Sequence, residues 1–271
     1  MHKVSRQIVV CICLIIVSCS DSEPPQVTQQ APTVDSIPTP SCNLTVGWEP
    51  WEPYMYLAPG NRVSGLDIEI IQALALETNC DLDYVQGDWK TLLEMVADGE
   101  VDLVAGATIS LNRGIYALFS DAYRNEDFVL YVRAGELSTF GTSLSAVLDA
   151  QKSFGITADY LYGDILDGYI NEPYYSKLFI TSDIGELNFF NLLQHQIDVV
   201  VEDPFVGAYN LNRKGISDQI KALPFTIHSG EVHMMFSKLT VSPEQVAQMN
   251  KALITIKDNN TYQAILDKYK Q

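Results

Sequence analysis

Short apolar runs alternate with amphipathic helical periods along most of this 271-residue chain. The strand-like runs are residues 44–46, 82–85, 101–105, 128–133, 153–157, 180–181 and 198–201. The helical periods are residues 67–77, 89–98, 163–170, 184–193, 205–212, 243–257 and 261–269, and residues 225–237 form a mixed strand and turn region. Because strands that alternate with helices usually pair in parallel, the pattern predicts an α/β fold with mainly parallel sheets.

Two such α/β units follow one another, and the chain crosses between them twice. We expect lobe I at residues 42–132 and 226–271 and lobe II at residues 133–225, joined by a two-strand hinge. Ligands of open α/β sheets bind at the carboxyl ends of the strands. The sequence therefore predicts a ligand cleft between the lobes.

The N-terminal segment has the layout of an export signal. Two basic residues precede an apolar run at residues 8–17, which is too short to span a bilayer. The run ends in Ile-Val-Ser-Cys19, which resembles a bacterial lipobox, so residues 1–18 are predicted to be a lipoprotein signal peptide and Cys19 the lipidated residue. A signal without lipid and an uncleaved anchor are the alternatives. Residues 19–41, rich in Pro, Ser, Thr and Gln, are expected to be a disordered tether.

The charge balance excludes some partners. The chain has 34 acidic against 17 basic residues and a formal net charge of −17. Nucleic acid and anionic lipid surfaces are poor partners for such a chain. We expect an exported protein of the cell envelope or periplasm that touches the membrane only through its lipid anchor.

Two of the five cysteines, Cys42 and Cys80, remain once the signal peptide and the lipidated residue are set aside. Each precedes a strand-like run, so their sulfur atoms would start at the same level if the two strands lay side by side and parallel. In an oxidising compartment we expect a disulfide, with two free thiols as the alternative. The sequence has no metal-ligand spacing of Cys or His, and His195, His228 and His233 are expected to be structural.

Residues 101–113 combine an expected buried strand, a turn of small residues and several polar groups. Gly106 tolerates a positive φ, and its two alanine neighbours leave room for a ligand to approach the backbone. Thr108 supplies a hydroxyl group, and Arg113 supplies a planar guanidinium suited to a carboxylate. The segment is similar to a carboxylate receptor. An ordinary capped helix with a surface arginine is the alternative.

Six short motifs occur in order along the rest of the chain. They are Trp51-Glu-Pro-Tyr54, Gly65-Leu-Asp-Ile-Glu69, Asp88-Trp89, Gly99-Glu-Val-Asp-Leu103, Phe119-Ser-Asp-Ala-Tyr123 and the strand with acidic turn at residues 198–203. With these motifs, residues 43–269 resemble the family-3 bacterial solute-binding proteins, the amino-acid receptors of ABC importers. The resemblance implies a two-lobed periplasmic binding protein fold of type II.

The resemblance also implies how the two charged ends of an amino acid would be bound. Arg113 would clamp the α-carboxylate, and Thr108 and the Gly106 N–H would complete the anion site. Asp203 would receive the α-ammonium group from the opposite lobe. The alternative for Asp203 is a cap or turn residue before Pro204.

Aromatic residues would supply the pocket for the ligand side chain. Trp51 and Trp89 stand where the family places residues that flank this side chain, and an indole face can hold a cation or stack on a planar group. Trp48 and Glu49 lie near the same wall of the pocket. Core packing is the favoured role of Trp48.

The expected second-lobe turn, residues 157–163, departs from the family pattern. Asp159 replaces the usual glycine and Leu161 stands near the usual hydroxyl position. A backbone N–H can still bind a carboxylate there, but the hydroxyl group is missing. We expect Tyr160 and Leu161 to line the pocket, and Tyr162 either to extend its wall or to cover the turn.

The favoured function is an extracytoplasmic receptor that closes on an amino acid or a close analogue by hinge motion and delivers it to an ABC permease. Such a receptor needs no cofactor, metal or catalytic residue, and we expect a monomer. One alternative is an enzyme on the same fold, similar to dehydratases of prephenate or arogenate, with Glu172 or Glu202 as the proton donor. The other is a sensory ligand-binding protein.

Overall fold

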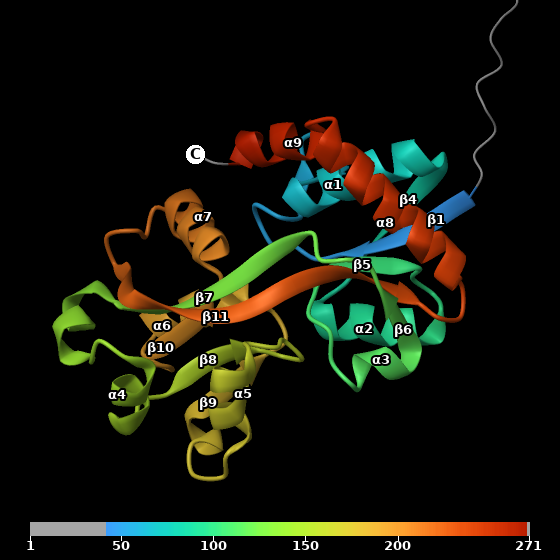
Figure 1. Cartoon of the computed structure of the whole chain (residues 1–271). Helices are drawn as coiled ribbons and strands as arrows, with labels where there is room; N and C mark the ends of the chain where they lie inside the picture. Colours follow the sequence, from blue (N-terminus) through green and yellow to red (C-terminus); the bar gives the residue numbers. More distant parts are fainter. Residues whose placement is uncertain (1–41, 270–271) are drawn as a thin grey trace, which may run out of the picture. The chain divides into compact units, whose positions relative to one another are not determined.

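The computed structural model of the chain describes residues 42–269 (Figure 1). The predicted signal peptide at residues 1–18, the lipidation of Cys19 and the tether at residues 19–41 lie outside the described residues. Across residues 42–269, none of the helices combines the length and the apolar character needed to cross a membrane.

The described residues build one large sheet, in the order β4-β1-β5-β11-β7-β10-β8-β9, with β6 paired to the last part of β11. Its strands are β1 (Cys42–Trp48), β4 (Cys80–Gln86), β5 (Leu103–Ala107), β6 (Ala117–Phe119), β7 (Arg124–Arg133), β8 (Phe154–Thr157), β9 (Phe179–Ser182), β10 (Val199–Glu202) and β11 (Ile220–Ser237). A separate hairpin consists of β2 (Tyr56–Ala58) and β3 (Arg62–Ser64).

Each half of the large sheet has a parallel core. In lobe I, β1 pairs in parallel with β4 and β5, and in lobe II, β8 pairs in parallel with β9 and β10. The antiparallel strands β7 and β11 run side by side through the middle and link the two halves (Figure 1). The predicted two-lobed α/β fold is confirmed. The expected lobe boundaries fall at the end of β7 and inside β11, and they stay a prediction.

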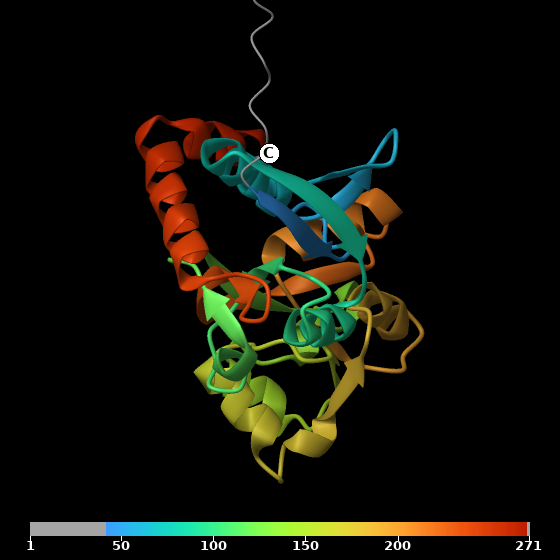
Figure 2. The same ribbon diagram turned by 90° about the vertical axis from the view of Figure 1, so that its right-hand side faces the viewer.

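Helices cover both faces of each half. They are α1 (Leu66–Thr78), α2 (Trp89–Asp98), α3 (Arg113–Tyr116), α4 (Leu144–Asp149), α5 (Asp164–Asn171), α6 (Glu186–Leu193), α7 (Pro204–Lys214), α8 (Pro243–Asp258) and α9 (Thr261–Tyr269), with 3₁₀ turns at Ala134–Thr139 and Ser176–Leu178. In lobe I, α1, α8 and α9 share a buried apolar cluster with one face of the sheet, and α2 packs on the other face. Figure 2 shows the paired strands β1 and β4, in blue and teal, in this lobe.

Alternating side chains of β7 supply both faces of lobe II. Phe128 and Leu130 belong to the buried cluster that contains residues of α4 and α5. Val129 and Tyr131 belong to the cluster that contains residues of α6 and α7. Because successive strand residues point to opposite faces, a strand covered on both sides reads as one continuous apolar run.

The turn expected at residues 105–107 is the end of β5 instead. Gly106 has a φ of 76°, and the pairing register of β11 shifts between His233 and Met235, which face this part of β5. The glycine therefore forms a bulge inside a strand, and the chain turns only after Ala107. A bulge beside the carboxyl end of a strand re-aims the residues that follow it.

The linking strands are longer than their apolar runs. β7 begins at Arg124, four residues before the run at Phe128, and β11 begins at Ile220 and extends through the region expected to be a mixture of strand and turn. β7 starts with four polar residues, and a proline, Pro224, interrupts the first part of β11, so hydrophobic periodicity alone misses these parts. The hairpin β2–β3, β6 and α4 were not predicted because each of these elements is too short to show a clear period.

The predicted disulfide is confirmed. Cys42 and Cys80 are the first residues of two adjacent parallel strands, and they are register partners. Their Cα atoms lie 4.6 Å apart. The bond ties the first strand of lobe I to its neighbour at the end of the sheet from which both strands start.

Removing this disulfide is expected to lower the free energy of unfolding by about 2–4 kcal/mol, because the unfolded chain regains the freedom of a loop. The two cysteines are 38 residues apart in sequence. Chemical denaturation of the double variant Cys42→Ser/Cys80→Ser measures the change. The carboxyl ends of both strands lie about 20 Å from the cysteines, so ligand binding there should be unaffected. An unchanged denaturation midpoint would contradict the expectation.

Candidate functional site

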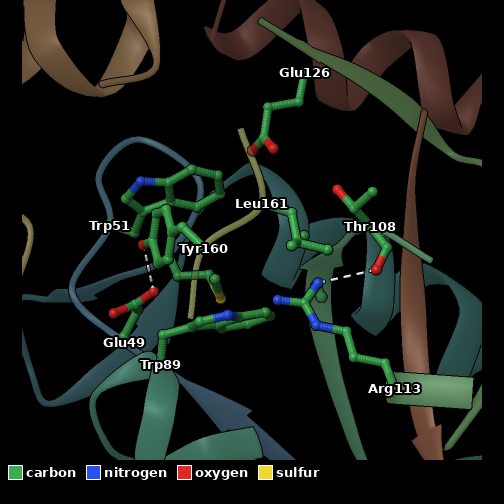
Figure 3. Close-up of a pocket in the computed structure, with 11 residues that line it drawn as sticks. Glu49, Trp51, Trp89, Thr108, Arg113, Glu126, Tyr160 and Leu161 are labelled. Carbon is green, nitrogen blue, oxygen red and sulfur yellow. Dashed lines mark hydrogen bonds between the residues drawn. The ribbon is translucent and has the colours of Figure 1, made fainter. Parts of the chain in front are cut away.

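A cavity lies between the two lobes at the carboxyl ends of β1 and β5 (Figure 3). It holds about 330 Å³ of space free of protein atoms, part of it open to solvent. Its lining residues are Glu49, Trp51, Met55, Trp89, Ala105, Gly106, Thr108, Arg113, Glu126, Tyr160 and Leu161. Tyr160 and Leu161 follow β8 in lobe II, so both lobes contribute to the wall. We call this space the first cavity.

Arg113 is the basic side chain of the first cavity. It is the first residue of α3, and only 6% of it is exposed. Its guanidinium donates hydrogen bonds to the carbonyl oxygens of Thr108 at 2.9 Å and Asp159 at 2.7 Å, and it lies 5.5 Å from the ring centroid of Trp89. Burial lowers the pKa of Arg113. Because both hydrogen bonds go to neutral carbonyl groups, the positive charge remains available to an anionic ligand group.

Glu126 points into the first cavity from the side opposite Arg113 (Figure 3). It is the third residue of β7, and only 6% of it is exposed. Burial raises the pKa of Glu126 to about 8, and the nearby Arg124, whose Nη1 lies 3.8 Å from Glu126 Oε1, opposes the rise. The first cavity therefore has a basic side and an acidic side.

Arg124 pairs more closely with Asp67 than with Glu126. Its Nε and Nη2 atoms each lie 3.2 Å from a carboxylate oxygen of Asp67. Its guanidinium carbon also lies 4.0 Å from the ring centroid of Tyr54. A two-pronged pair of this kind holds both groups in place. Arg124 is therefore shared between two carboxyl groups, those of Asp67 and Glu126.

Hydrogen bonds across the cleft join lobe I to lobe II. They run from Trp89 Nε1 to Asp159 O (3.3 Å), Arg113 Nη2 to Asp159 O (2.7 Å), Tyr160 Oη to Glu49 Oε1 (2.7 Å), Tyr54 Oη to Asp203 Oδ2 (3.2 Å) and Arg213 Nη1 to Glu52 Oε1 (2.8 Å). The lobes are therefore in contact, and the structure is a closed form of the cleft.

A sequence profile of the bacterial extracellular solute-binding proteins, family 3, matches residues 44–271. The chain belongs to this family. No curated protein sequence matches it.

Several solved structures resemble this solute-binding protein. A histidine kinase sensor domain with similarity to periplasmic binding proteins superposes with a TM-score of 0.73 at 16% identity, over 86% of this chain and 97% of that one. An ancestral arginine-binding protein bound to glutamine gives 0.71 at 22% identity, over 84% and 97%. A substrate-binding protein of an ABC uptake transporter from Streptococcus pneumoniae, with bound histidine, gives 0.70 at 17% identity, over 84% and 92%. At such identities these likenesses establish the fold.

Most residues that the sequence predicted for the ligand site of this solute-binding protein line one cavity. They are Trp51, Trp89, Gly106, Thr108, Arg113, Tyr160 and Leu161, together with Glu49 from the expected wall. The carboxyl ends of β1, β5 and β8 bring them together. The role of each residue toward a ligand stays a prediction.

The N–H of Gly106, which was expected to bind a carboxylate, is occupied. It donates to the hydroxyl oxygen of Tyr123 at 2.9 Å. Gly106 instead allows the ring of Trp51 to pack closely against the backbone, because a Cβ at this position would lie 3.3 Å from that ring. The φ of Gly106, 76°, also favours glycine. Of the groups predicted to form an anion site, this leaves Arg113 and Thr108.

Three predicted residues do not line the first cavity. Asp203 Oδ1 accepts hydrogen bonds from the N–H groups of Phe205 at 2.7 Å and Val206 at 3.0 Å, so it caps α7, as its alternative interpretation required. Trp48 is buried in the core of lobe I. Tyr162 is buried in the core of lobe II, where it covers the turn rather than extending the wall. The ammonium-binding role of Asp203 stays a prediction without direct access to this cavity.

The second-lobe turn presents a carbonyl group where an N–H was expected. Asp159 has a φ of 58°, and its carbonyl oxygen accepts from both Arg113 and Trp89. Leu161 follows as an apolar lining residue. In this structure the turn therefore accepts hydrogen bonds from Arg113 and Trp89, and its part in binding an anion stays a prediction.

Glu126 is the charged residue of the first cavity that was not predicted from the sequence. The alternation of a strand could have indicated its burial, since Glu126 lies two residues before Phe128 and therefore on the same face of β7. Of the two acids considered for catalysis, Glu202 is buried and lines a cavity of the cleft, whereas Glu172 is exposed at the end of α5 and lines neither that cavity nor the first. An acid role for either residue stays a prediction.

Proposed function

We propose that this protein is an extracytoplasmic receptor for an amino acid or a close analogue. The observation that carries the proposal is the opposition of Arg113 and Glu126 within one closed cavity. The α-carboxylate would lie on Arg113 and the α-ammonium group against Glu126. A zwitterion would give Arg113, whose guanidinium contacts only neutral carbonyl groups, a charged partner, and would give Glu126 a second one besides Arg124. A ligand that lacks either group would lose one of these charged contacts and be rejected.

Closure by hinge bending would couple binding to a change of shape. β7 and β11 are the linking strands, and the hydrogen bonds across the cleft would break when the lobes open. A ligand held from both lobes favours the closed form by its extra contacts there. We propose that the closed form is delivered to an ABC permease, and that the protein is exported and anchored through Cys19. Membership of an extracellular solute-binding family and the amino-acid ligands of the similar structures support this.

A thermal-shift screen of the purified protein against the 20 standard amino acids tests the proposal. We expect one or a few of them to raise the melting temperature by several degrees, because a ligand at 100 times its Kd stabilises the folded state by about 2.7 kcal/mol. Sugars and simple dicarboxylates are the controls and should have no effect. The absence of any shift with every amino acid would contradict the proposal.

A dehydratase-like enzyme is the second candidate, and one observation favours it. Glu126 lies inside the cavity and its pKa is raised to about 8 by burial, so it holds a proton at neutral pH and could donate it. Incubation of the protein with prephenate or arogenate tests this candidate. Turnover that is lost in Glu126→Gln would establish the enzyme, whereas ligand binding without turnover supports the receptor.

A further inference from the structure

A second cavity adjoins the first. Glu49, Trp51 and Tyr160 line both cavities and form the partition between them. The second cavity extends from this partition to Glu202, the last residue of β10, and to Asn210 in α7. It holds about 1120 Å³ of space free of protein atoms, part of it open to solvent. The two cavities therefore share one wall, and a ligand group that passed Trp51 would reach the second.

Four carboxylates line the second cavity, and two of them already have strong partners. They are Glu49, Asp88, Glu186 and Glu202, and the lining that the structure describes includes no Lys or Arg. Asp88 caps α2 by accepting from the N–H of Thr91 at 2.9 Å. Glu186 forms ion pairs with Lys214 and Arg213. The remaining two, Glu49 and Glu202, are the candidates for a ligand.

Glu49 and Glu202 are buried, and neutral groups supply their hydrogen bonds. Glu49 is 7% exposed and accepts from the Tyr160 hydroxyl at 2.7 Å. Glu202 is 3% exposed and accepts from the Asp203 N–H at 2.9 Å and from Trp51 Nε1 at 3.5 Å. Burial raises the pKa of Glu49 to about 7 and that of Glu202 to about 8. Buried carboxyl groups normally have a cationic partner.

Two buried oxygen atoms without a hydrogen-bond partner lie in the part of the structure around Glu202. Asn210 lines the second cavity, is 4% exposed, and its Oδ1 has no hydrogen-bond partner. The hydroxyl of Thr157 has none either. A Cβ on Gly185 would lie 2.9 Å from Thr157 Oγ1 and 3.3 Å from Glu202 Oε2, so the glycine leaves space beside these oxygens. Buried oxygens without partners are rare in folded proteins, and these await a donor.

We propose that the second cavity binds a cationic side-chain group, so that the ligand is a basic amino acid of the arginine or lysine type. The inference rests on the proposed function, because Arg113 and Glu126 would hold the α-groups in the first cavity. The side chain would then pass Trp51 and place its N–H donors against the oxygens of Glu202 and Asn210. Guanidinium and ammonium groups only donate hydrogen bonds, so they match a site made of acceptors.

Two features fit an organic cation better than a metal ion. The indole of Trp51 forms part of the partition, and cations bind favourably over such a ring. Among residues 42–269, no group of three or more His, Cys, Asp or Glu side chains is arranged to hold a metal ion.

Calorimetric titration of the purified protein with L-arginine and L-citrulline tests the inference. Citrulline has nearly the shape of arginine but no side-chain charge. We expect wild-type protein to bind L-arginine, or L-lysine used as a second probe, at least tenfold more tightly than L-citrulline. Glu202→Gln should reduce the affinity for the basic amino acid at least tenfold and change that for L-citrulline by less than about twofold. Glu172→Gln, on the exposed end of α5, is the matched control and should change neither.

The outcomes separate this inference from the proposed function. Wild-type binding of neutral amino acids with the same or higher affinity than L-arginine and L-lysine would overturn the cationic subsite and leave the receptor intact. Failure of every amino acid to bind would overturn both. The melting temperature of ligand-free Glu202→Gln shows whether the variant is folded, and Glu49→Gln provides a second variant from the opposite lobe with the same expected loss.

Discussion

Replacing Arg113 with alanine is expected to weaken binding of the amino-acid ligand by about 100-fold or more. Arg113 is buried at the basic side of the first cavity, and its guanidinium makes hydrogen bonds only to carbonyl oxygens in this structure. Losing the partner of a buried charged group costs about 2–5 kcal/mol, and each 1.4 kcal/mol is a factor of ten in affinity. Calorimetry measures the loss, and the ligand-dependent rise in melting temperature should disappear with it.

Two further variants make the Arg113 result specific. Arg113→Lys keeps the charge but loses the planar fork, so its affinity should lie between those of the wild type and the alanine variant. Arg62→Ala changes an exposed arginine on β3 and should bind normally. Full affinity in Arg113→Ala would remove Arg113 from the ligand site.

Replacing Glu126 with glutamine is expected to stabilise the ligand-free protein at alkaline pH and to weaken ligand binding at the same time. The pKa of Glu126 is raised by burial from its ordinary value of 4.5 to about 8 in the folded protein. Between these values the folded state keeps a proton that the unfolded state has lost, so the wild type loses stability as the pH rises through this window. Each pKa unit corresponds to about 1.4 kcal/mol. Glutamine has no proton to lose.

Melting temperatures at pH 4 and pH 9 measure the stability effect. At pH 4 Glu126 is protonated in both states, so the wild type and Glu126→Gln should differ little. At pH 9 the ligand-free variant should melt several degrees higher than the wild type. The same variant should bind the amino acid at least tenfold more weakly, since a bound ammonium group favours the ionised form of Glu126 and loses this charged partner in the variant. Glu231→Gln, exposed on β11, is the control. A variant that is destabilised at pH 9 would contradict a desolvated carboxyl at this position.

Much of the site can be predicted from the sequence, because its residues lie next to strands and helices that local patterns identify. Trp51, Trp89 and Arg113 follow or precede elements whose periodicity is clear, and the carboxyl ends of parallel strands meet at one edge of the sheet. The same reasoning placed Cys42 beside Cys80, since both begin strands that turned out to be register partners. These predictions needed the order of elements and no knowledge of side-chain contacts.

The acidic half of the site did not follow from the sequence. Asp203 has the residue type and position of an ammonium ligand, yet its Oδ1 accepts two N–H groups of α7. A local cap and a ligand contact use the same residue types, so sequence alone does not separate them. Glu126 was not predicted at all, because a polar residue before an apolar run is normally taken to lie outside the strand. Its burial depends on Arg124 and Asp67, which are distant in sequence from each other.

The bulge at Gly106 is a third feature that tertiary contacts determine and local sequence does not. A small-residue stretch after an apolar run predicts a turn, but β11 pairs with the stretch and keeps it in the sheet. The N–H of Gly106 then meets the hydroxyl of Tyr123 from the start of the linking strands. Pairing between segments more than 100 residues apart lies beyond local propensity.

The proposed receptor holds both charged ends of one amino acid in the first cavity. Calorimetric titration with three compounds measures this: the tightest-binding amino acid, the amine that lacks its α-carboxylate, and the acid that lacks its α-ammonium group. We expect the amino acid to bind and both analogues to lose at least about 100-fold in affinity, since each loses its charged contact with Arg113 or Glu126. Equal binding of the amino acid and either analogue would show that the first cavity does not hold both charged ends.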